Sequence, residues 1–177
     1  ISSKVPEPQP AQLEQALLKA QQMLLENGLT AVADMGTSPA DWAAMRRMYE
    51  SGRLKVRIMS YAGGSDALAA IAPNGPTGWL YGDRLRLGGM KLYSDGALGS
   101  RGAWLKQPYA DRPDTRGLPL LTPEELRAQT GAAAGKGFQI AVHAIGDAAN
   151  DMVLDAYEAV MPAGQRNPLR HALIHCQ

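Results

Sequence analysis

The sequence has little that would cross-link the chain or direct it to a charged or apolar surface. It contains one cysteine, Cys176, which excludes an intrachain disulfide and favours a reducing, cytoplasmic compartment. Its 18 basic and 17 acidic side chains leave a net charge of +1, so no basic face for nucleic acid is expected. No run approaches the roughly 18 consecutive apolar residues of a membrane-spanning helix. We therefore expect neither a nucleic-acid nor a membrane partner.

The residues that are present are typical of a globular chain with many turns. Hydrophobic residues make up 45% of the sequence and charged residues 20%, unlike a disordered segment. Prolines at every second position from Pro6 to Pro10 predict an extended linker over residues 1–10, followed by a single unit over residues 11–177. Because the chain begins with isoleucine and ends directly after an apolar run, we interpret it as a fragment of a longer polypeptide.

Helical and strand patterns alternate along the chain. Amphipathic periodicity and capping signals predict helices over about 13–24, 39–50, 67–71, 122–137 and 147–161. Short apolar runs predict strands over about 29–33, 54–61, 85–93, 139–143 and 170–175. This alternation indicates an α/β fold with a parallel sheet, either an open doubly wound sheet or part of a (β/α)8 barrel.

Polar side chains collect where the predicted strands end, which is where both architectures build active sites. They are Asp34, Lys91, Asp95, His143, Asp147, His171 and His175. Two of the three histidines, His143 and His175, could converge on one metal ion, since imidazole is a common zinc ligand. The alternative is that each is a buried neutral imidazole hydrogen-bonded to the backbone. Asp147 is expected to cap the following helix. His171 is expected either to support a metal ligand from behind or to be structural.

Lys91 is unusual because it lies inside a predicted buried strand, where an unpartnered ammonium group is costly. Three interpretations remain open at this point. Lys91 could pair with Asp95, act as a Schiff-base nucleophile with a lowered pKa, or react with CO2 to give a metal-binding carbamate.

The segment from 94 to 121 is a long loop, and loops of this length are usually functional or disordered. Its glycines at 96, 99 and 102 suggest a phosphate-binding loop, but their spacing fits neither of the known glycine-rich nucleotide motifs. We favour a loop whose glycines allow close backbone approach. Arg101, within it, is a candidate contact for a substrate oxygen, and the alternative is a solvated cation on the loop.

Several motifs resemble one enzyme family. Residues 90–101 read M-K-L-Y-S-D-G-A-L-G-S-R and resemble the K-[LF]-x-x-D-G-[SA]-L-G-S-R segment of the YtcJ-like, amidohydrolase-3 branch of the amidohydrolase superfamily. The family's P-Y-x-D, R-G-L and H-A-I-G-D-x-A-N signatures are similar to residues 108–111, 116–118 and 143–150. The resemblance extends over residues 11–177 and implies a partial (β/α)8 TIM-type barrel, with the five predicted strands as its second to sixth.

The resemblance also implies a metal site. Lys91 matches the family's fourth-strand lysine, which is carbamylated in some members and binds or bridges metal. His143 matches the fifth-strand histidine ligand, and His175 matches the sixth-strand one, although Ile174 replaces the glutamate usual before it. The implied cofactor is one or two divalent ions, with zinc expected. The family's first-strand H-x-H pair and its eighth-strand aspartate have no counterpart in these residues, so we expect the isolated chain to be inactive.

The implied reaction is metal-assisted hydrolysis of a carbon–nitrogen bond in a small molecule, such as an amide, an N-formyl group or a cyclic amide. Asp95, Arg101 and Tyr109, in the long loop, are the expected substrate contacts. Two alternatives are kept: a lyase that uses Lys91 as a Schiff-base nucleophile, and a non-catalytic interaction module. Because a section of a barrel exposes strand edges, pairing with a second copy is also expected.

Overall fold

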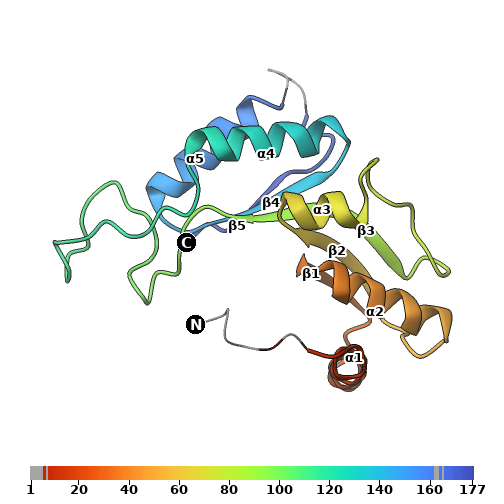
Figure 1. Ribbon diagram of the computed structural model, residues 1–177. Helices are drawn as coiled ribbons and strands as arrows, with labels where there is room; N and C mark the ends of the chain where they lie inside the picture. The colour runs from red at the N-terminus through yellow and green to blue at the C-terminus, as the bar shows by residue number, and fades with distance from the viewer. Residues whose placement is uncertain (1–5, 7, 162–163, 165) are drawn as a thin grey trace.

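The strands form one curved parallel sheet. The computed structural model describes residues 6, 8–161, 164 and 166–177. Five strands are hydrogen-bonded in chain order, each parallel to the next. They are β1 (Ala31–Thr37), β2 (Arg57–Gly63), β3 (Leu85–Tyr93), β4 (Gln139–Ala144) and β5 (Ala172–His175). Figure 1 shows the sheet curving from β1 to β5 through the centre of the molecule.

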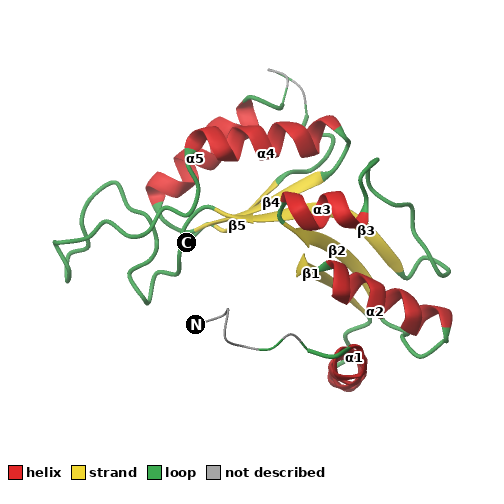
Figure 2. Cartoon of the chain, viewed as in Figure 1, coloured by secondary structure: helices red, strands yellow, loops and turns green. Residues whose placement is uncertain are grey.

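Helices connect consecutive strands and lie along the outer side of the curved sheet (Figure 2). They are α2 (Pro39–Glu50), α3 (Ser65–Ile71), α4 (Pro123–Gly135) and α5 (Asp147–Glu158), with α1 (Pro10–Glu26) ahead of the first strand. The strand order follows the sequence without the reversal that defines a doubly wound sheet. The structure therefore confirms the predicted α/β fold and partial (β/α)8 barrel.

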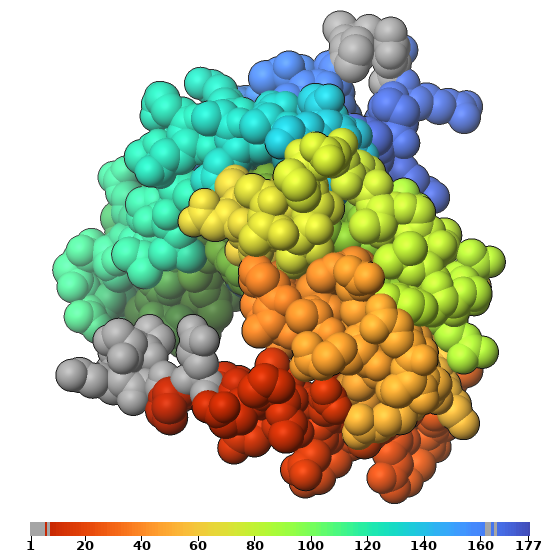
Figure 3. Space-filling view, turned by 45° about the vertical axis from the view of Figure 1, so that its right-hand side comes forward, coloured from red at the N-terminus to blue at the C-terminus, as the bar shows by residue number. Residues whose placement is uncertain are grey.

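The first helix lies against α2, as Figure 3 shows for the red and orange parts of the chain. Glu14 pairs with Arg47 at 3.2 Å and with Arg53 at 2.8 Å. Most of the predicted linker over residues 1–10 lies outside the described residues. Pro10, however, is the first residue of α1, a position that proline favours. Among the helices that the structure describes, none has the length and hydrophobicity needed to cross a membrane.

The capping signals read from the sequence act as predicted. Ser38 Oγ accepts a hydrogen bond from the Asp41 N–H at 3.1 Å, and Thr122 Oγ1 accepts one from the Glu125 N–H at 3.2 Å. In both helices the acidic side chain also accepts from the backbone N–H of the capping residue. These reciprocal bonds satisfy amide groups that have no partner within the helix.

Three strands begin later than predicted because turns use the first residues of the apolar runs. The Leu29 N–H donates to Leu24 O at 2.8 Å and closes α1, so β1 starts at Ala31 rather than 29. The Arg53 N–H closes α2 in the same way, which delays β2. Arg170 has a left-handed backbone, with φ at 58°, so β5 begins at Ala172.

The main hydrophobic core lies between the sheet and the helices. It includes alternate residues of β4, namely Ile140, Val142 and Ala144. From β3 it includes Leu85, Leu87, Met90 and Leu92, whose spacing is not a simple alternation. The reason is a β-bulge: Ser60 pairs with Leu87 and Tyr61 pairs with Gly89, so Gly88 has no register partner on β2. After the bulge, Lys91 and Tyr93 lie on the face opposite the helices.

Candidate functional site

Three of the predicted site residues gather at the carboxyl ends of β3, β4 and β5. The rings of His143 and His175 meet edge to face, with centroids 4.7 Å apart. Tyr93 lies between His143 and Lys91, because its ring centroid is 5.5 Å from the His143 ring and 3.9 Å from Lys91 Nζ. Tyr93 was missed at the sequence level, although its position two residues after Lys91 places it on the same face of the strand.

Lys91 is nearly buried, with 3% of its surface exposed. Its ammonium donates to Leu92 O at 3.1 Å and lies over the Tyr93 ring. The alternative ion pair with Asp95 does not form, and in the described part of the chain no carboxylate lies within ion-pair distance of Lys91. Removal from water lowers the pKa of Lys91 to about 8. The unprotonated amine, which both CO2 and carbonyl groups require, is therefore more accessible than in a free lysine.

His143 is held on both its backbone and its ring. Its carbonyl accepts from the Ser94 N–H at 2.9 Å and from Ser94 Oγ at 2.6 Å. Its Nε2 lies 3.4 Å from Asp95 Oδ1 and 3.5 Å from Gly96 O. Because both neighbours are acceptors, we assign the ring hydrogen to Nε2, which leaves the Nδ1 lone pair available.

Burial is the main reason that the pKa of His143 is lowered. The charge of Lys91 and the nearby His175 lower this pKa further, whereas the Gly96 carbonyl and Asp95 raise it. The balance favours a neutral imidazole at neutral pH, which is the form that binds metal.

His175 reaches the site through the end of its strand rather than through the sheet register. In that register Ile174, and not His175, is the partner of His143. His175 leaves the extended conformation, with φ at 79°, while the following Cys176 N–H donates to Ala144 O at 3.1 Å. Unlike His143 and Lys91, His175 is exposed.

The three expected substrate contacts bond mainly to the protein itself. Asp95 is buried and accepts backbone N–H groups from Trp104, Ile145 and Gly146 at 2.8, 3.1 and 2.8 Å. Tyr109 is also buried, and its hydroxyl donates to Ala103 O at 2.8 Å. Arg101 pairs with Asp111 at 2.6 Å on the loop surface. Of the three, Asp95 is the one that lies beside His143.

The remaining polar candidates have structural contacts. Asp34 lies within β1, not after it, and accepts from Thr37 Oγ1 at 2.5 Å. The residue that caps α5 is Gly146; Asp147, the predicted cap, accepts from the Lys106 N–H at 2.8 Å and so ties the long loop to this helix. His171 has the structural one of its two expected roles, since its Nδ1 accepts from the Ile140 N–H at 3.1 Å.

The glycine-rich loop folds back on itself, as the non-nucleotide interpretation predicted. The Gly96 N–H donates to Gly102 O at 3.0 Å, and a Cβ at Gly96 would lie 3.0 Å from Gly102 Cα. The glycines therefore permit two backbone segments to touch.

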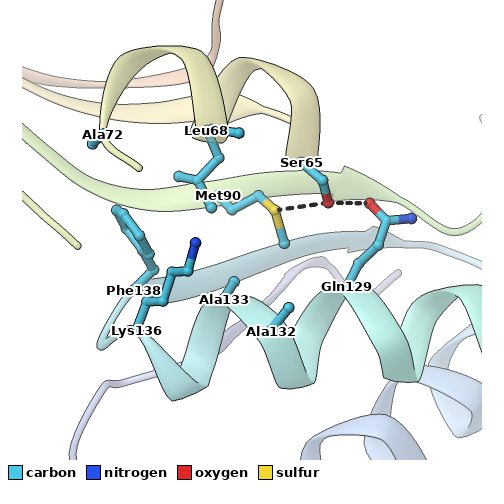
Figure 4. Close-up of a pocket in the computed structure, with 10 residues that line it drawn as sticks. Ser65, Leu68, Ala72, Met90, Gln129, Ala132, Ala133, Lys136 and Phe138 are labelled. Carbon is cyan, nitrogen blue, oxygen red and sulfur yellow. Dashed lines mark hydrogen bonds between the residues drawn. The ribbon is translucent and has the colours of Figure 1, made fainter. Parts of the chain in front are cut away.

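A separate cavity of about 210 Å³ lies between α3 and α4, on the helix side of β3 (Figure 4). Ser65 Oγ donates to Gln129 Oε1 at 2.8 Å at one end, and Met90 and Phe138 line the interior. Since Met90 and Lys91 are adjacent strand residues on opposite faces, this cavity is separated from the His143 and His175 pair by the sheet.

The donor groups at the strand ends are of chemical types that bind a divalent metal, but they make up only part of a complete set of ligands. Two imidazoles and one desolvated lysine are present, and the lysine becomes an anionic oxygen ligand only as a carbamate. Within the residues that the structure describes, no group of three or more His, Cys, Asp or Glu side chains is arranged to hold a metal ion. The ligand roles of Lys91, His143 and His175 thus stay predictions.

Comparison with known proteins identifies what the chain is similar to. The sequence model described as "Amidohydrolase family" matches residues 1–177. Protein LONG AFTER FAR-RED 3 of Arabidopsis thaliana is 34% identical over 173 residues, which cover 92% of this chain and 30% of that protein. YtcJ of Bacillus subtilis (strain 168) is 44% identical over 98 residues, or 55% of this chain and 18% of YtcJ.

A solved structure shares the fold. The crystal structure of an uncharacterized metal-dependent hydrolase from Pyrococcus furiosus superposes with a TM-score of 0.79 and 33% identity, covering 90% of this chain and 33% of that one. The chain spans about a third or less of the length of each of these relatives.

Proposed function

Since this chain belongs to the amidohydrolase family, we propose that it forms part of a metal-dependent hydrolase acting on carbon–nitrogen bonds other than peptide bonds, such as those of amides, N-formyl groups and cyclic amides. The observation that supports this proposal most directly is the contact of His143 with His175 at the ends of two neighbouring strands, with Lys91 on the next strand linked to His143 through the Tyr93 ring. In barrels of this type, the carboxyl ends of the strands form the active site.

Lys91, His143 and His175 would hold the metal, with zinc the expected ion. A divalent metal bound there supplies Lewis-acid polarisation of the scissile carbonyl and activation of a water molecule. Lys91 enters as a carbamate: its neutral amine attacks CO2 and loses one proton, which gives an anionic oxygen donor. The lowered pKa of Lys91 supports this step because more of the amine is neutral near pH 7 than in a free lysine.

Arg101 and Tyr109 are proposed to contact a small-molecule substrate from the loop over residues 94–121. Arg101 bonds Asp111 through Nε and Nη2, so its Nη1 remains available for a substrate oxygen. Tyr109 can accept a hydrogen bond while its hydroxyl donates to Ala103 O. Because the chain supplies three ligands and no general base equivalent to the family's final aspartate, we propose that these 177 residues alone do not catalyse the reaction.

One observation favours a second candidate. A desolvated lysine with a pKa of about 8 and no carboxylate partner in the described residues is also suited to Schiff-base formation. Two experiments distinguish these functions. Borohydride with a carbonyl substrate would trap a Schiff base on Lys91, whereas a chelator would abolish activity only in the metal-dependent hydrolase.

Metal analysis of the full polypeptide that carries this chain tests the first function. We expect one or two equivalents of zinc per polypeptide, and a loss of at least half of this metal in Lys91→Ala, His143→Ala and His175→Ala variants. His171→Gln is the matched control, because in the described part of the chain the His171 ring hydrogen-bonds to the Ile140 N–H and stacks on Tyr157, away from the candidate ligands. It should leave the metal content unchanged. A protein that carries no metal and takes up none from added zinc would contradict the hydrolase mechanism.

A further inference from the structure

Asp95 is a buried carboxylate whose oxygens are fully used by the protein. It is 1% exposed, and its Oδ2 accepts the N–H groups of Trp104 and Gly146, both at 2.8 Å. Its Oδ1 accepts the Ile145 N–H at 3.1 Å and faces His143 Nε2 at 3.4 Å. A carboxylate offers about four lone-pair positions, so these four neighbours leave none for a substrate.

The backbone donors come from two segments that are far apart in the sequence. Trp104 belongs to the loop over residues 94–121, whereas Ile145 and Gly146 form the turn that precedes α5. The two segments approach so closely that a Cβ at Gly146 would lie 1.9 Å from Trp104 O. Asp95 therefore holds the loop against the N-terminal end of α5, where exposed amide groups favour a negative charge.

The same carboxylate connects this junction to the candidate metal ligand. The Gly96 O and Asp95 Oδ1 acceptors, at 3.5 and 3.4 Å, both favour a hydrogen on His143 Nε2. Carboxylates that accept from a ligating histidine fix its tautomer and ring orientation in many metal sites. The Ser94 bonds to the His143 carbonyl fix the backbone of that histidine, but they do not determine how its ring is turned.

We propose that Asp95 is a positioning residue: it fixes the ring orientation and hydrogen position of His143 and couples both to the docking of the 94–121 loop on α5. This role replaces the substrate contact expected from the sequence. The expected effect of Asp95 on metal binding rests on the proposed function. Its expected effect on the position of the His143 ring hydrogen does not depend on that function.

The first test uses the full polypeptide in its metal-free, unsubstituted form, with 15N-labelled histidine. Long-range 1H–15N NMR distinguishes the two neutral imidazole tautomers, and a His143→Gln variant identifies the signal of His143. We expect hydrogen on Nε2 at neutral pH. Hydrogen on Nδ1, or a mixture of the two tautomers close to that of free histidine, would overturn the proposal. This test needs no substitution of Asp95.

The second test compares Asp95→Asn with Asp114→Asn. The amide keeps the shape of the carboxylate but turns an N–H donor towards backbone donors or towards His143. Asp114 is a matched control on the same loop, because it is exposed and its ion pair among the described residues is with its near neighbour Arg112. We expect Asp95→Asn to weaken Co2+ binding by about 10- to 100-fold and to alter the visible spectrum of the bound Co2+, while Asp114→Asn changes neither.

The outcomes separate the two proposals. A folded Asp95→Asn protein with wild-type Co2+ affinity and spectrum, and only a lower melting temperature, would show a purely structural role and overturn the positioning proposal. If no form binds Co2+, the metal-dependent function fails, and the positioning role of Asp95 stands when the His143 hydrogen is on Nε2 in the unsubstituted protein but not in folded Asp95→Asn. An unchanged hydrogen position in Asp95→Asn would assign it to the Gly96 carbonyl and overturn the positioning proposal. If Asp95→Asn does not fold, hydrogen on Nδ1 in the unsubstituted protein still overturns the proposal.

Discussion

Strands β3 and β4 place one candidate ligand each on the same face of the sheet, but they do so in different ways. Along β4, alternate residues face the helices, and His143 lies on the opposite face by simple alternation from Ile140 and Val142. Along β3, simple alternation from Leu85 and Leu87 would put Lys91 among the helices. The extra residue at the Gly88 bulge moves the side chains after it to the opposite face of the sheet. Met90 therefore enters the core and Lys91 does not.

The difference shows that a single extra residue in a strand can decide whether a charged side chain meets a core or a site. The bulge requires small residues, because a Cβ at Gly89 would lie 2.4 Å from the Tyr61 ring and 2.5 Å from Gln139 O. A Cβ at Gly88 would lie 2.7 Å from Met59 Cε, which is a flexible end and can move. Gly89 is therefore the more restrictive position.

The largest effect on stability is expected from Gly89→Ala, which places a side chain next to the bulge in β3. Its Cβ meets both a ring and a backbone oxygen, so we expect the free energy of unfolding to fall by about 3 kcal/mol in urea denaturation. Gly131→Ala in α4 is the matched control, because in the described part of the chain its added Cβ meets nothing within 4 Å beyond the local backbone of α4. It should raise stability by about 0.5–1 kcal/mol. Equal stability of Gly89→Ala and wild type would show that β3 does not need this glycine.

Smaller effects are expected from one substitution on each strand, and they should change the free energy of unfolding in opposite directions. Lys91→Met removes a buried ammonium that has no carboxylate partner in the described residues, and should raise the free energy of unfolding by about 1 kcal/mol. His143→Leu removes a neighbour of the buried Asp95 carboxylate and should lower it by about 1 kcal/mol. Thermal and urea unfolding of the metal-free variants measure both. Destabilisation by Lys91→Met would indicate that the bond to Leu92 O and the contact with the Tyr93 ring outweigh the cost of burying the ammonium.

The smallest effect concerns the attachment of β5 to β4 and depends on pH. Burial lowers the pKa of His171, and its Nδ1 must stay unprotonated to accept the Ile140 N–H. The stabilising contribution of His171 is therefore complete above its unfolded-state pKa of about 6.5 and is lost as pH falls through the lower folded-state value.

The measurement is the melting temperature between pH 7.5 and 5 for wild type and His171→Gln. Below pH 6.5 the stability of wild type should fall more steeply than that of His171→Gln. For this one proton, the slopes of the free energy of unfolding differ by at most about 1.4 kcal/mol per pH unit. Parallel curves for the two proteins would contradict a role of His171 in acid sensitivity. Carboxylates titrate in both proteins, so their contribution cancels in the difference.

Local sequence signals predicted the elements well where the deciding contacts are local. The helix starts at Pro39 and Pro123 follow from capping boxes that span only four residues each. The starts of β1, β2 and β5 were less predictable, because turn residues such as Leu29 and Arg170 are apolar or long and look like strand formers. Their hydrogen bonds and backbone angles depend on how the preceding segment ends.

The sequence by itself determined the α/β order, the helix caps and the residue types of the candidate site, because periodicity, capping and motif resemblance depend on neighbours along the chain. Only the tertiary structure decided that Lys91 turns away from the core, that His175 rather than its register-paired neighbour meets His143, and that Asp95 is enclosed by backbone amides. Each of these outcomes depends on atoms contributed by segments tens of residues away. Local patterns carry no information about such contacts, whereas packing and hydrogen bonding in the folded chain determine them.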